Sequence, residues 1–108
     1  TGTTMINDAL EKHLDLSHID MVCNNLKILS NPDRLKILCV LIENELNVQQ
    51  IEQHTQIRQP TLSQQLSVLR NHEIVSTRRE SKQIFYQLND VRILKIMRTL
   101  YEIYCKSE

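Results

Sequence analysis

The fold is decided by residues 59–88, which read QPTLSQQLSVLR (59–70), NHE (71–73) and IVSTRRESKQIFYQL (74–88). In the first part, Leu62, Leu66 and Leu69 recur at three- and four-residue steps, which predicts a helix with one apolar face. The period then changes to two, and the β-branched and aromatic residues favour two strands, over 74–79 and 83–88. The residues between the strands form a turn, so this stretch predicts a helix followed directly by a two-stranded hairpin.

Capping signals place the helices that precede the hairpin. The run SNPD (30–33) combines a capping side chain, a proline and an acid, which predicts a helix over about 32–43. The second half of this helix is apolar on nearly every side, so we expect it at the centre of the domain. Asn47 caps a short helix over 48–54, and residues 55–57 form a turn. Pro60 then takes the first position of a helix that runs to about Arg70.

Apolar periodicity also predicts helices at both ends of the chain. The steps between Met5 and Leu29 predict an N-terminal helix, which Ser17 is expected to break into two pieces. Asn89 and Asp90 cap a last helix that runs to about Cys105, and its apolar face is broader than a lone surface helix needs. The order of elements predicts a winged helix-turn-helix, which is a mainly α fold with a small β-hairpin. We expect one domain over residues 1–108, joined into a homodimer through its first and last helices.

The composition excludes several functional classes. The chain has 108 residues, of which 41% are hydrophobic and 24% charged, so it suits one globular domain and offers no membrane span. Gly2 is the single glycine, which excludes the glycine-rich loops that bind nucleotide phosphates. The histidines and cysteines lack the spacing of a zinc finger or zinc protease, and no nucleophile–base pair is visible. We therefore expect neither an enzyme nor a bound metal or cofactor.

The cysteines and the start of the chain indicate a compartment. Three widely spaced cysteines do not form the disulfide framework of a secreted domain, and we expect no signal peptide. A reducing, cytoplasmic setting follows. Thr1 to Thr4 precede Met5, and we interpret them as a leftover of expression that carries no structural weight.

The net charge of zero hides an asymmetry between the two halves of the chain. Residues 1–57 carry four basic and eight acidic groups, a balance of −4, whereas residues 58–108 carry nine basic and five acidic groups, a balance of +4. Such a split permits a basic face on the second half, where the helix from Pro60 and the hairpin lie.

The outward side of the helix from Pro60 carries the residues that we expect to bind DNA. Opposite its leucines lie short hydroxyl and amide side chains, which suit hydrogen bonds to base edges, and cations flank them where phosphates would lie. The predicted DNA-binding residues are Arg58, Gln59, Thr61, Ser63, Gln64, Gln65, Arg70, Arg78, Arg79 and Lys82. A merely solvated helix face would explain the serines and glutamines but not the basic hairpin as well. Winged helices also serve as protein-interaction modules. Acidic residues on the outward side of the helix from Pro60 would have indicated that role.

Three runs together resemble the ArsR/SmtB family of bacterial dimeric repressors: LSNPDRLKIL (29–38), QPTLSQQLSVLR (59–70) and IVSTRRESKQIFYQL (74–88). The similarity spans about residues 20–105 in the family's order and spacing. It implies that the helix matching 60–70 enters the major groove of double-stranded operator DNA, that the hairpin is the wing, and that the first and last helices form the dimer interface. Ser81 departs from the glycine that many members have at the wing tip.

The resemblance also allows the family's two common metal sites to be tested. One uses a C-x-C pair on the short helix, where residues 45–50 contain no thiol. The other uses residues near both ends of the last helix, which here are Asp90, Arg92, Ile103 and Lys106. Only Asp90 is a zinc ligand, so both sites are predicted to be absent.

Two cysteines are the candidate sensing residues. Cys39 in the core helix and Cys105 after LYEIY (100–104) resemble the reactive-sulfur-sensing branch of the family, the SqrR and BigR type. That resemblance implies that persulfides join the two thiols through extra sulfur atoms and lower DNA affinity, in control of sulfide-detoxification genes. Free cysteine is also commonly a small buried hydrophobe, which is the interpretation that we keep for Cys23.

Two other inducers stay open. Arsenite takes three thiolates, so a trithiolate site would form if Cys23 approached Cys39 and Cys105. A plain dithiol–disulfide switch would differ from the persulfide switch only in the number of bridging sulfur atoms.

Overall fold

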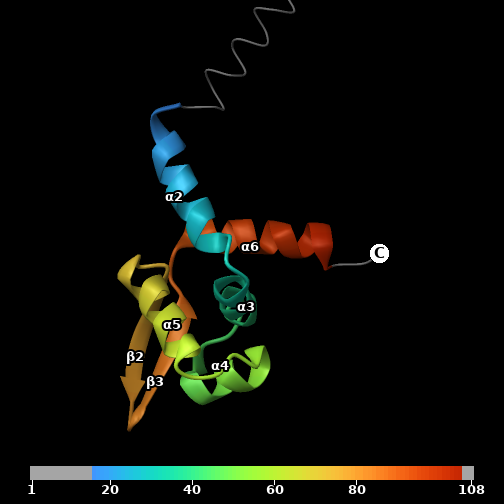
Figure 1. Cartoon of the computed structure of the whole chain (residues 1–108). Helices are drawn as coiled ribbons and strands as arrows, with labels where there is room; N and C mark the ends of the chain where they lie inside the picture. Colours follow the sequence, from blue (N-terminus) through green and yellow to red (C-terminus); the bar gives the residue numbers. More distant parts are fainter. Residues whose placement is uncertain (1–15, 106–108) are drawn as a thin grey trace, which may run out of the picture.

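The computed structural model describes residues 16–105, and Figure 1 labels its elements. Its elements in chain order are η1 (Leu16–His18), α2 (Ile19–Leu29), α3 (Pro32–Val40), β1 (Leu46–Asn47), α4 (Val48–Thr55), α5 (Thr61–Asn71), β2 (Val75–Glu80), β3 (Gln83–Leu88) and α6 (Val91–Tyr104). This order of helices and hairpin confirms the predicted winged helix-turn-helix. Of the two pieces predicted between Met5 and Leu29, the first, before Ser17, lies mostly outside the described residues. The second piece is α2. Within 16–105 no helix is long and apolar enough to cross a membrane.

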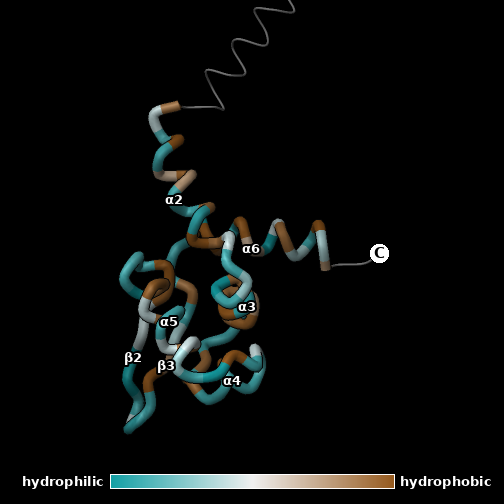
Figure 2. Tube along the Cα trace, viewed as in Figure 1, coloured by the Kyte–Doolittle hydropathy of each residue, from teal (hydrophilic) through white to brown (hydrophobic). Residues whose placement is uncertain are grey.

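The hydrophobic core forms around α3, which lies between α6 and α4 in Figure 1 and is brown in the hydropathy colouring of Figure 2. Ile37 and Leu38 of α3 are fully buried, as predicted for a central helix. They belong to one cluster with buried residues from the other elements, among them Leu29, Ile51, Leu62, Leu69, Val75, Ile93 and Met97. Because burying one such side chain contributes roughly 1.5–3 kcal/mol, this cluster stabilises helices too short to persist alone.

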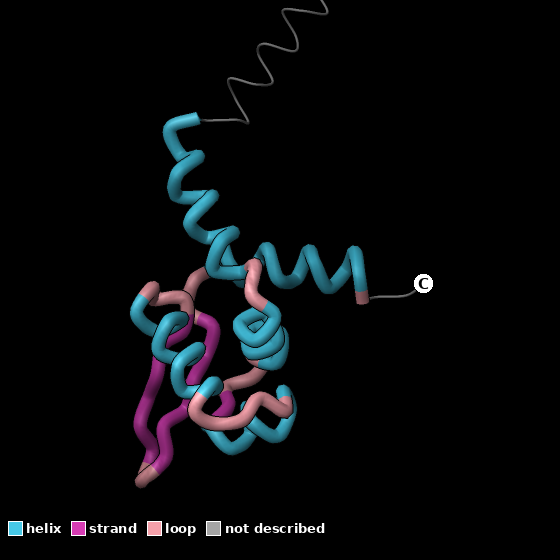
Figure 3. Tube along the Cα trace, in the orientation of Figure 1, coloured by secondary structure: helices cyan, strands magenta, loops and turns pink. Residues whose placement is uncertain are grey.

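The sheet has three antiparallel strands in the order β1-β3-β2, drawn in magenta in Figure 3. The predicted hairpin is confirmed, with Val75 opposite Leu88 and Arg78 opposite Phe85. The sequence prediction of only two strands is wrong, because β1 pairs Leu46 with Tyr86. Two residues are too few to show alternation, so the pattern that revealed the hairpin could not reveal β1. The third strand ties the wing to the start of α4.

Side-chain caps start three of the helices where the sequence predicted them. The Asn31 side chain accepts a hydrogen bond from the backbone N–H of Arg34 at 3.0 Å. Asn47 and Gln50 form a reciprocal capping box at the start of α4. Asp90 accepts hydrogen bonds from the backbone N–H groups of Arg92 and Ile93. These bonds and the Arg92 side chain lower the pKa of the Asp90 carboxyl, although its partial burial opposes them.

Two predicted helix boundaries are wrong. The helix predicted to reach residue 43 ends at Val40, because the N–H groups of Leu41 and Ile42 bond to carbonyls only three residues back. Leu41 is nevertheless 2% exposed, so the apolar run after α3 marks burial in a tight turn rather than more helix. The helix predicted to start at Pro60 starts at Thr61, with Pro60 as its N-cap.

Candidate nucleic-acid interface and thiol pair

A tight turn between α4 and α5 positions α5, which is the candidate helix for reading DNA bases and is called the reading helix below. The Thr55 hydroxyl donates to the carbonyl of Ile51 and accepts from the N–H of Ile57, which closes the turn inside the core. Gln56 takes a left-handed φ of 63° and ends α4. The turn predicted over 55–57 is therefore only partly confirmed, because Thr55 is still the last residue of α4 and the chain leaves the helix at Gln56.

The two sides of α5 differ as the sequence predicts. Leu62, Leu66 and Leu69 are at most 2% exposed and anchor the helix in the core. The opposite side presents exposed side chains from its first two turns, which are Ser63, Gln64 and Ser67. Thr61 is half-buried at the helix start. This polar side is the only part of α5 that a DNA groove would meet directly.

The glutamines of this region do not share one role. Gln59 folds back over the helix start, where its side-chain oxygen accepts from the N–H of Ser63 at 3.1 Å and from its hydroxyl at 2.6 Å. Gln59 and Ser63 therefore form a cap that satisfies part of the helix N-terminus. Gln64 has no side-chain hydrogen bond to another residue of the described chain. Its amide group is available to a base edge.

Gln65 belongs to a network that sequence analysis missed. Its side-chain oxygen accepts from Nη1 of Arg34 at 2.9 Å, and Arg34 Nε donates to the carbonyl of Ile28 at 2.7 Å. A third, longer contact of 3.5 Å runs from Arg34 Nη2 to the carbonyl of Lys27. Arg34 thus joins the C-terminal end of α2 to the reading helix. No local pattern indicates this role, because Gln65 lies 31 residues from Arg34 in the chain.

The wing carries one arginine that is paired with carboxylates and two cations that form no ion pair with a described residue. Arg78 donates to Glu45 at 2.7 Å and to Glu80 at 2.8 Å, and its guanidinium lies 4.8 Å from the centre of the Phe85 ring. The hydrogen bonds to Glu45 and then Glu80 raise the pKa of Arg78, and these two carboxylates offset its positive charge. Arg79 and Lys82 are exposed and form no ion pair with another described residue.

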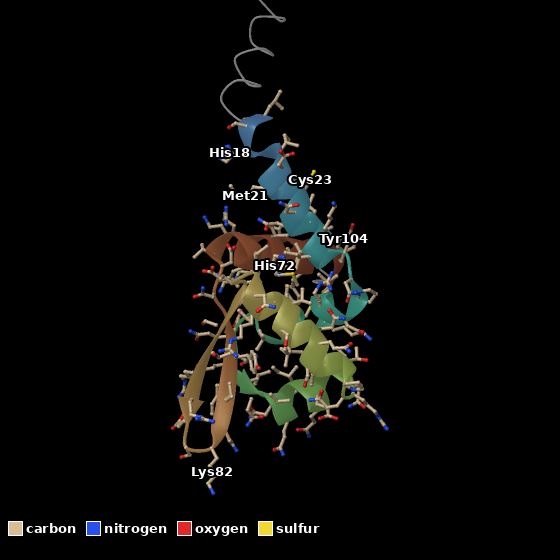
Figure 4. The ribbon with its side chains drawn as sticks, turned by 60° about the vertical axis from the view of Figure 1, so that its left-hand side comes forward. His18, Met21, Cys23, His72, Lys82 and Tyr104 are labelled. Atoms are coloured by element: carbon tan, nitrogen blue, oxygen red, sulfur yellow. The ribbon has the colours of Figure 1, made fainter. Side chains whose placement is uncertain are left out.

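The tip of the wing is built without glycine. Ser81 takes a left-handed φ of 59°, the conformation for which glycine is usual, and Lys82 projects from the tip in Figure 4. Arg58 and Arg70 are exposed at the two ends of α5. Arg58, Arg70, Arg79 and Lys82 are thus four exposed cations, two near the ends of α5 and two in the wing.

The two candidate sensing thiols lie close enough to interact electrostatically. Cys39 is in the last turn of α3, and Cys105 ends α6, where its N–H donates to the carbonyl of Tyr101 at 2.8 Å. Both are exposed and neither is in a disulfide. Although part of Cys39 meets solvent, the protein around its sulfur raises the thiol pKa by burial, and the nearby Cys105 raises it further.

A cleft of about 500 Å³ opens beside Cys39, between the end of α3 and one side of α6. Its lining residues are Cys39, Ile42, Glu43, Asn44, Arg98, Tyr101 and Glu102. A small molecule can therefore approach the Cys39 thiol directly from solvent.

The third cysteine does not join this pair. Cys23 is on α2, as labelled in Figure 4, and no group of three His, Cys, Asp or Glu side chains within residues 16–105 could hold a metal ion. Of the positions compared with the family's metal sites, Asp90 serves as the cap of α6 and its Arg92 neighbour pairs with it at 3.4 Å. Lys106 lies outside the described residues.

Exposed apolar side chains cover much of α2 and the end of α6. Val22 and Leu26 on α2 are 47% and 51% exposed, and Ile103 on α6 is 64% exposed. Arg92 Nη1 donates to the sulfur of Met21 at 2.7 Å, which joins the two helices near the start of α6. These exposed apolar side chains on two helices mark a candidate surface for contact with another protein chain.

Comparisons with known proteins agree with this architecture. Residues 31–77 match the family described as "Bacterial regulatory protein, arsR family". The biofilm growth-associated repressor of Xylella fastidiosa (strain Temecula1 / ATCC 700964) is 51% identical over 87 residues, covering 81% of this chain and 76% of that protein.

Solved structures extend the similarity to nearly the whole chain. The transcriptional repressor BigR from Xylella fastidiosa superposes with a TM-score of 0.79 at 44% identity, covering 94% of this chain and 98% of that one. The homodimeric winged helix-turn-helix DNA-binding domain Mb0332 from Mycobacterium bovis has a TM-score of 0.70 at 26% identity, covering 82% of each chain. Fold, matched residues and relatives therefore assign this chain to the ArsR family of bacterial regulatory proteins, which are not enzymes.

Proposed function

We propose that this ArsR-family transcriptional repressor leaves its DNA operator when persulfides join Cys39 and Cys105 through sulfur. The observation that carries this proposal is the pair of exposed thiols, Cys39 in the last turn of α3 and Cys105 at the end of α6, with Cys105 near enough to raise the pKa of Cys39. A repressor of this kind would work in the cytoplasm on sulfide-detoxification genes. Its relatives include repressors of the BigR type, which supports the DNA-binding part of the proposal.

The chemistry requires only persulfide and the two thiols. One cysteine thiolate attacks the outer sulfur of a persulfide RSSH and releases RS⁻. The resulting cysteine persulfide attacks the inner sulfur of a second RSSH and expels HS⁻, which leaves a mixed trisulfide. The other cysteine thiolate then displaces RS⁻ from it, so two RSSH and two thiols give one trisulfide bridge, two RSH and H₂S. The second persulfide is the oxidant, and its outer sulfur is reduced to H₂S.

DNA binding requires two reading helices held at a fixed separation. We propose that the apolar surfaces of α2 and α6 join two protomers, as their exposure favours. Two α5 helices would then enter successive major grooves about 34 Å apart. Gln64 would contact base edges, while Arg58, Arg70, Arg79 and Lys82 contact phosphates.

A sulfur bridge would act on this spacing. Linking Cys39 to Cys105 fixes the end of α6 against α3, and α6 contributes to the proposed dimer surface. The two reading helices would lose the separation that fits the DNA. A hundredfold loss of DNA affinity corresponds to about 2.7 kcal/mol of coupling, which is within the usual allosteric range.

The test combines peptide mapping with DNA binding. Cys39→Ser and Cys105→Ser should each bind an operator selected from random duplexes and stay bound after persulfide treatment. Cys23→Ser is the matched control and should be released like the wild type. Release without a sulfur-linked 39–105 peptide would refute the mechanism. The mass of that peptide distinguishes a disulfide from a trisulfide, and an arsenic adduct of all three thiols would favour arsenite instead.

The reading surface has its own test. Gln64→Ala should weaken selected operators more than random duplexes, because a lost base contact costs roughly 1–3 kcal/mol of discrimination. Gln49→Ala, which changes an exposed glutamine of α4 outside this polar side, is the control. An unchanged ratio of selected to random affinity in Gln64→Ala would remove Gln64 from the reading surface.

A further inference from the structure

The cleft beside the thiol pair carries charges of both signs. Its charged lining residues are one arginine, Arg98, and two glutamates, Glu43 and Glu102, which together sum to −1. All three are exposed, and none forms an ion pair with another residue in the described range. The cleft volume of about 500 Å³ lies in the range of small-molecule sites, roughly 300–1,000 Å³. Space, unpaired charges and a thiol therefore meet at one place.

We propose that this cleft binds the α-amino-acid head of a low-molecular-weight persulfide and presents its outer sulfur to Cys39. Arg98 binds the carboxylate, while Glu43 and Glu102 bind the ammonium group. A planar guanidinium suits a carboxylate because two N–H groups can donate in parallel. A zwitterionic amino acid can pair with both the positive and the negative side chains of the cleft. An inorganic hydropersulfide anion would instead meet a lining whose net charge is negative. The inference rests on the proposed function and names the class of its inducer.

The arrangement on α6 supports this placement. Arg98, Glu102 and Cys105 follow one another at four- and three-residue steps, so they share one side of the helix. Cys39 lines the cleft from α3. An amino acid held by Arg98 and Glu102 therefore lies beside the Cys39 thiol, where orientation favours sulfur transfer.

The step in the cleft is a transfer of one sulfur atom. The Cys39 thiolate attacks the outer sulfur of the bound persulfide, forming a new S–S bond to Cys39 and breaking the S–S bond of the amino acid. The electron pair of the broken bond leaves on the amino-acid sulfur, which takes up the proton lost by Cys39. One thiol and one persulfide thus give one persulfide and one thiol, with no net oxidation.

The experiment measures the rate of the sulfur-linked Cys39–Cys105 product by quenched mass spectrometry of the full chain. The probes are cysteine hydropersulfide, the hydropersulfide of N-acetylcysteine methyl ester, which lacks both charges, and inorganic hydropersulfide. For each probe, the wild-type rate is divided by that of Arg98→Gln, so that differences in intrinsic probe reactivity cancel. We expect a ratio of about ten for cysteine hydropersulfide, the effect of about 1.4 kcal/mol, and about one for the other probes. Lys95→Gln, an exposed cation of α6 outside the cleft lining, is the matched control.

Each other outcome overturns a defined claim. A ratio near one for cysteine hydropersulfide overturns the binding site while the proposed function stands. An equal loss with all three probes means that Arg98 acts on the thiols rather than on the ligand, which also overturns it. No sulfur-linked product with any probe overturns the proposed function itself. As a second readout, S-methylcysteine should slow the reaction with cysteine hydropersulfide in the wild type but not in Arg98→Gln, and absence of this protection contradicts the site.

Discussion

Replacing Arg34 with methionine is expected to destabilise the domain more than any other exchange of a partly exposed cation for an apolar residue. Methionine keeps the stem of the side chain but removes the guanidinium, which donates to Ile28 at 2.7 Å and to Gln65 at 2.9 Å. Hydrogen bonds to a charged group contribute about 1.5–3 kcal/mol each when buried, and the partial exposure of Arg34 reduces each to about 1–1.5 kcal/mol. The contact of 3.5 Å to Lys27 is too long to add much. We therefore expect a loss of about 2–3 kcal/mol in the free energy of unfolding.

The assay is urea unfolding followed by circular dichroism at one fixed protein concentration, since association changes the apparent stability. In a thermal scan followed by the same signal, a loss of 2–3 kcal/mol should lower the melting temperature by roughly 10–20 °C for a domain of this size. Lys36→Met is the matched control, because Lys36 is an exposed cation of the same helix. It should change the stability by less than about 0.5 kcal/mol.

A double-mutant cycle isolates the contact between α3 and the reading helix. Gln65→Met alone should cost about 1 kcal/mol, and adding it to Arg34→Met should cost much less, since their shared hydrogen bond is already gone. Additive losses in the cycle, or a loss below about 0.5 kcal/mol in Arg34→Met, would show that Arg34 does not join the two helices.

Three further predictions follow from contacts of the wing, the last helix and the apolar surface. Arg79→Met should reduce the slope of log DNA affinity against log salt concentration by about 0.9 per lost phosphate contact, as measured by anisotropy titrations in a salt series. Arg78→Met should barely change that slope, because two carboxylates already pair with Arg78. Equal slopes for the two variants would contradict the different roles given to Arg78 and Arg79. Asp90→Ala should cost about 1 kcal/mol at neutral pH through loss of the cap. Since the folded pKa of Asp90 is lowered, this contribution is present above a pH of about 4 and fades as pH falls through the folded pKa, so unfolding curves of both proteins should converge in acid. Leu26→Glu should give monomers in sedimentation at micromolar concentration, whereas Asn24→Glu on the same helix should stay dimeric; a dimeric Leu26→Glu would exclude α2 from the interface.

The sequence predicted the helices and strands that are marked by an apolar periodicity or by a capping residue. The leucines of α5, the alternation of β2 and β3, and the capping residues Asn31, Asn47 and Asp90 each act through neighbours within a few positions. Such local effects can be read without knowing the rest of the fold. The end of α3 could not be read in this way, because Leu41 is held by the core and not by helical hydrogen bonds.

The roles of single polar residues depended on partners distant in the chain. Gln65 and Gln64 are adjacent and chemically identical, yet only Gln65 meets Arg34, and only the fold brings those two together. Arg78 and Arg79 are likewise adjacent, but alternation along β2 directs Arg78 toward Glu45 and Phe85. Sequence analysis grouped all four as DNA-binding residues. The proximity of Cys39 and Cys105 was available only through the family resemblance until the packing of α6 was known.

The two ends of α3 carry the two parts of the proposed switch. At its start, Arg34 joins the end of α2 to Gln65 of the reading helix. Near its end lies Cys39, whose thiol pKa is raised by burial and by the nearby Cys105 at the end of α6, and no disulfide joins the two cysteines. In the proposed mechanism, a sulfur bridge between Cys39 and Cys105 adds a covalent link between α3 and α6 and leaves the Arg34 network intact. Because α2 and α6 both carry exposed apolar side chains, we expect this link to change the geometry between protomers rather than the reading helix itself.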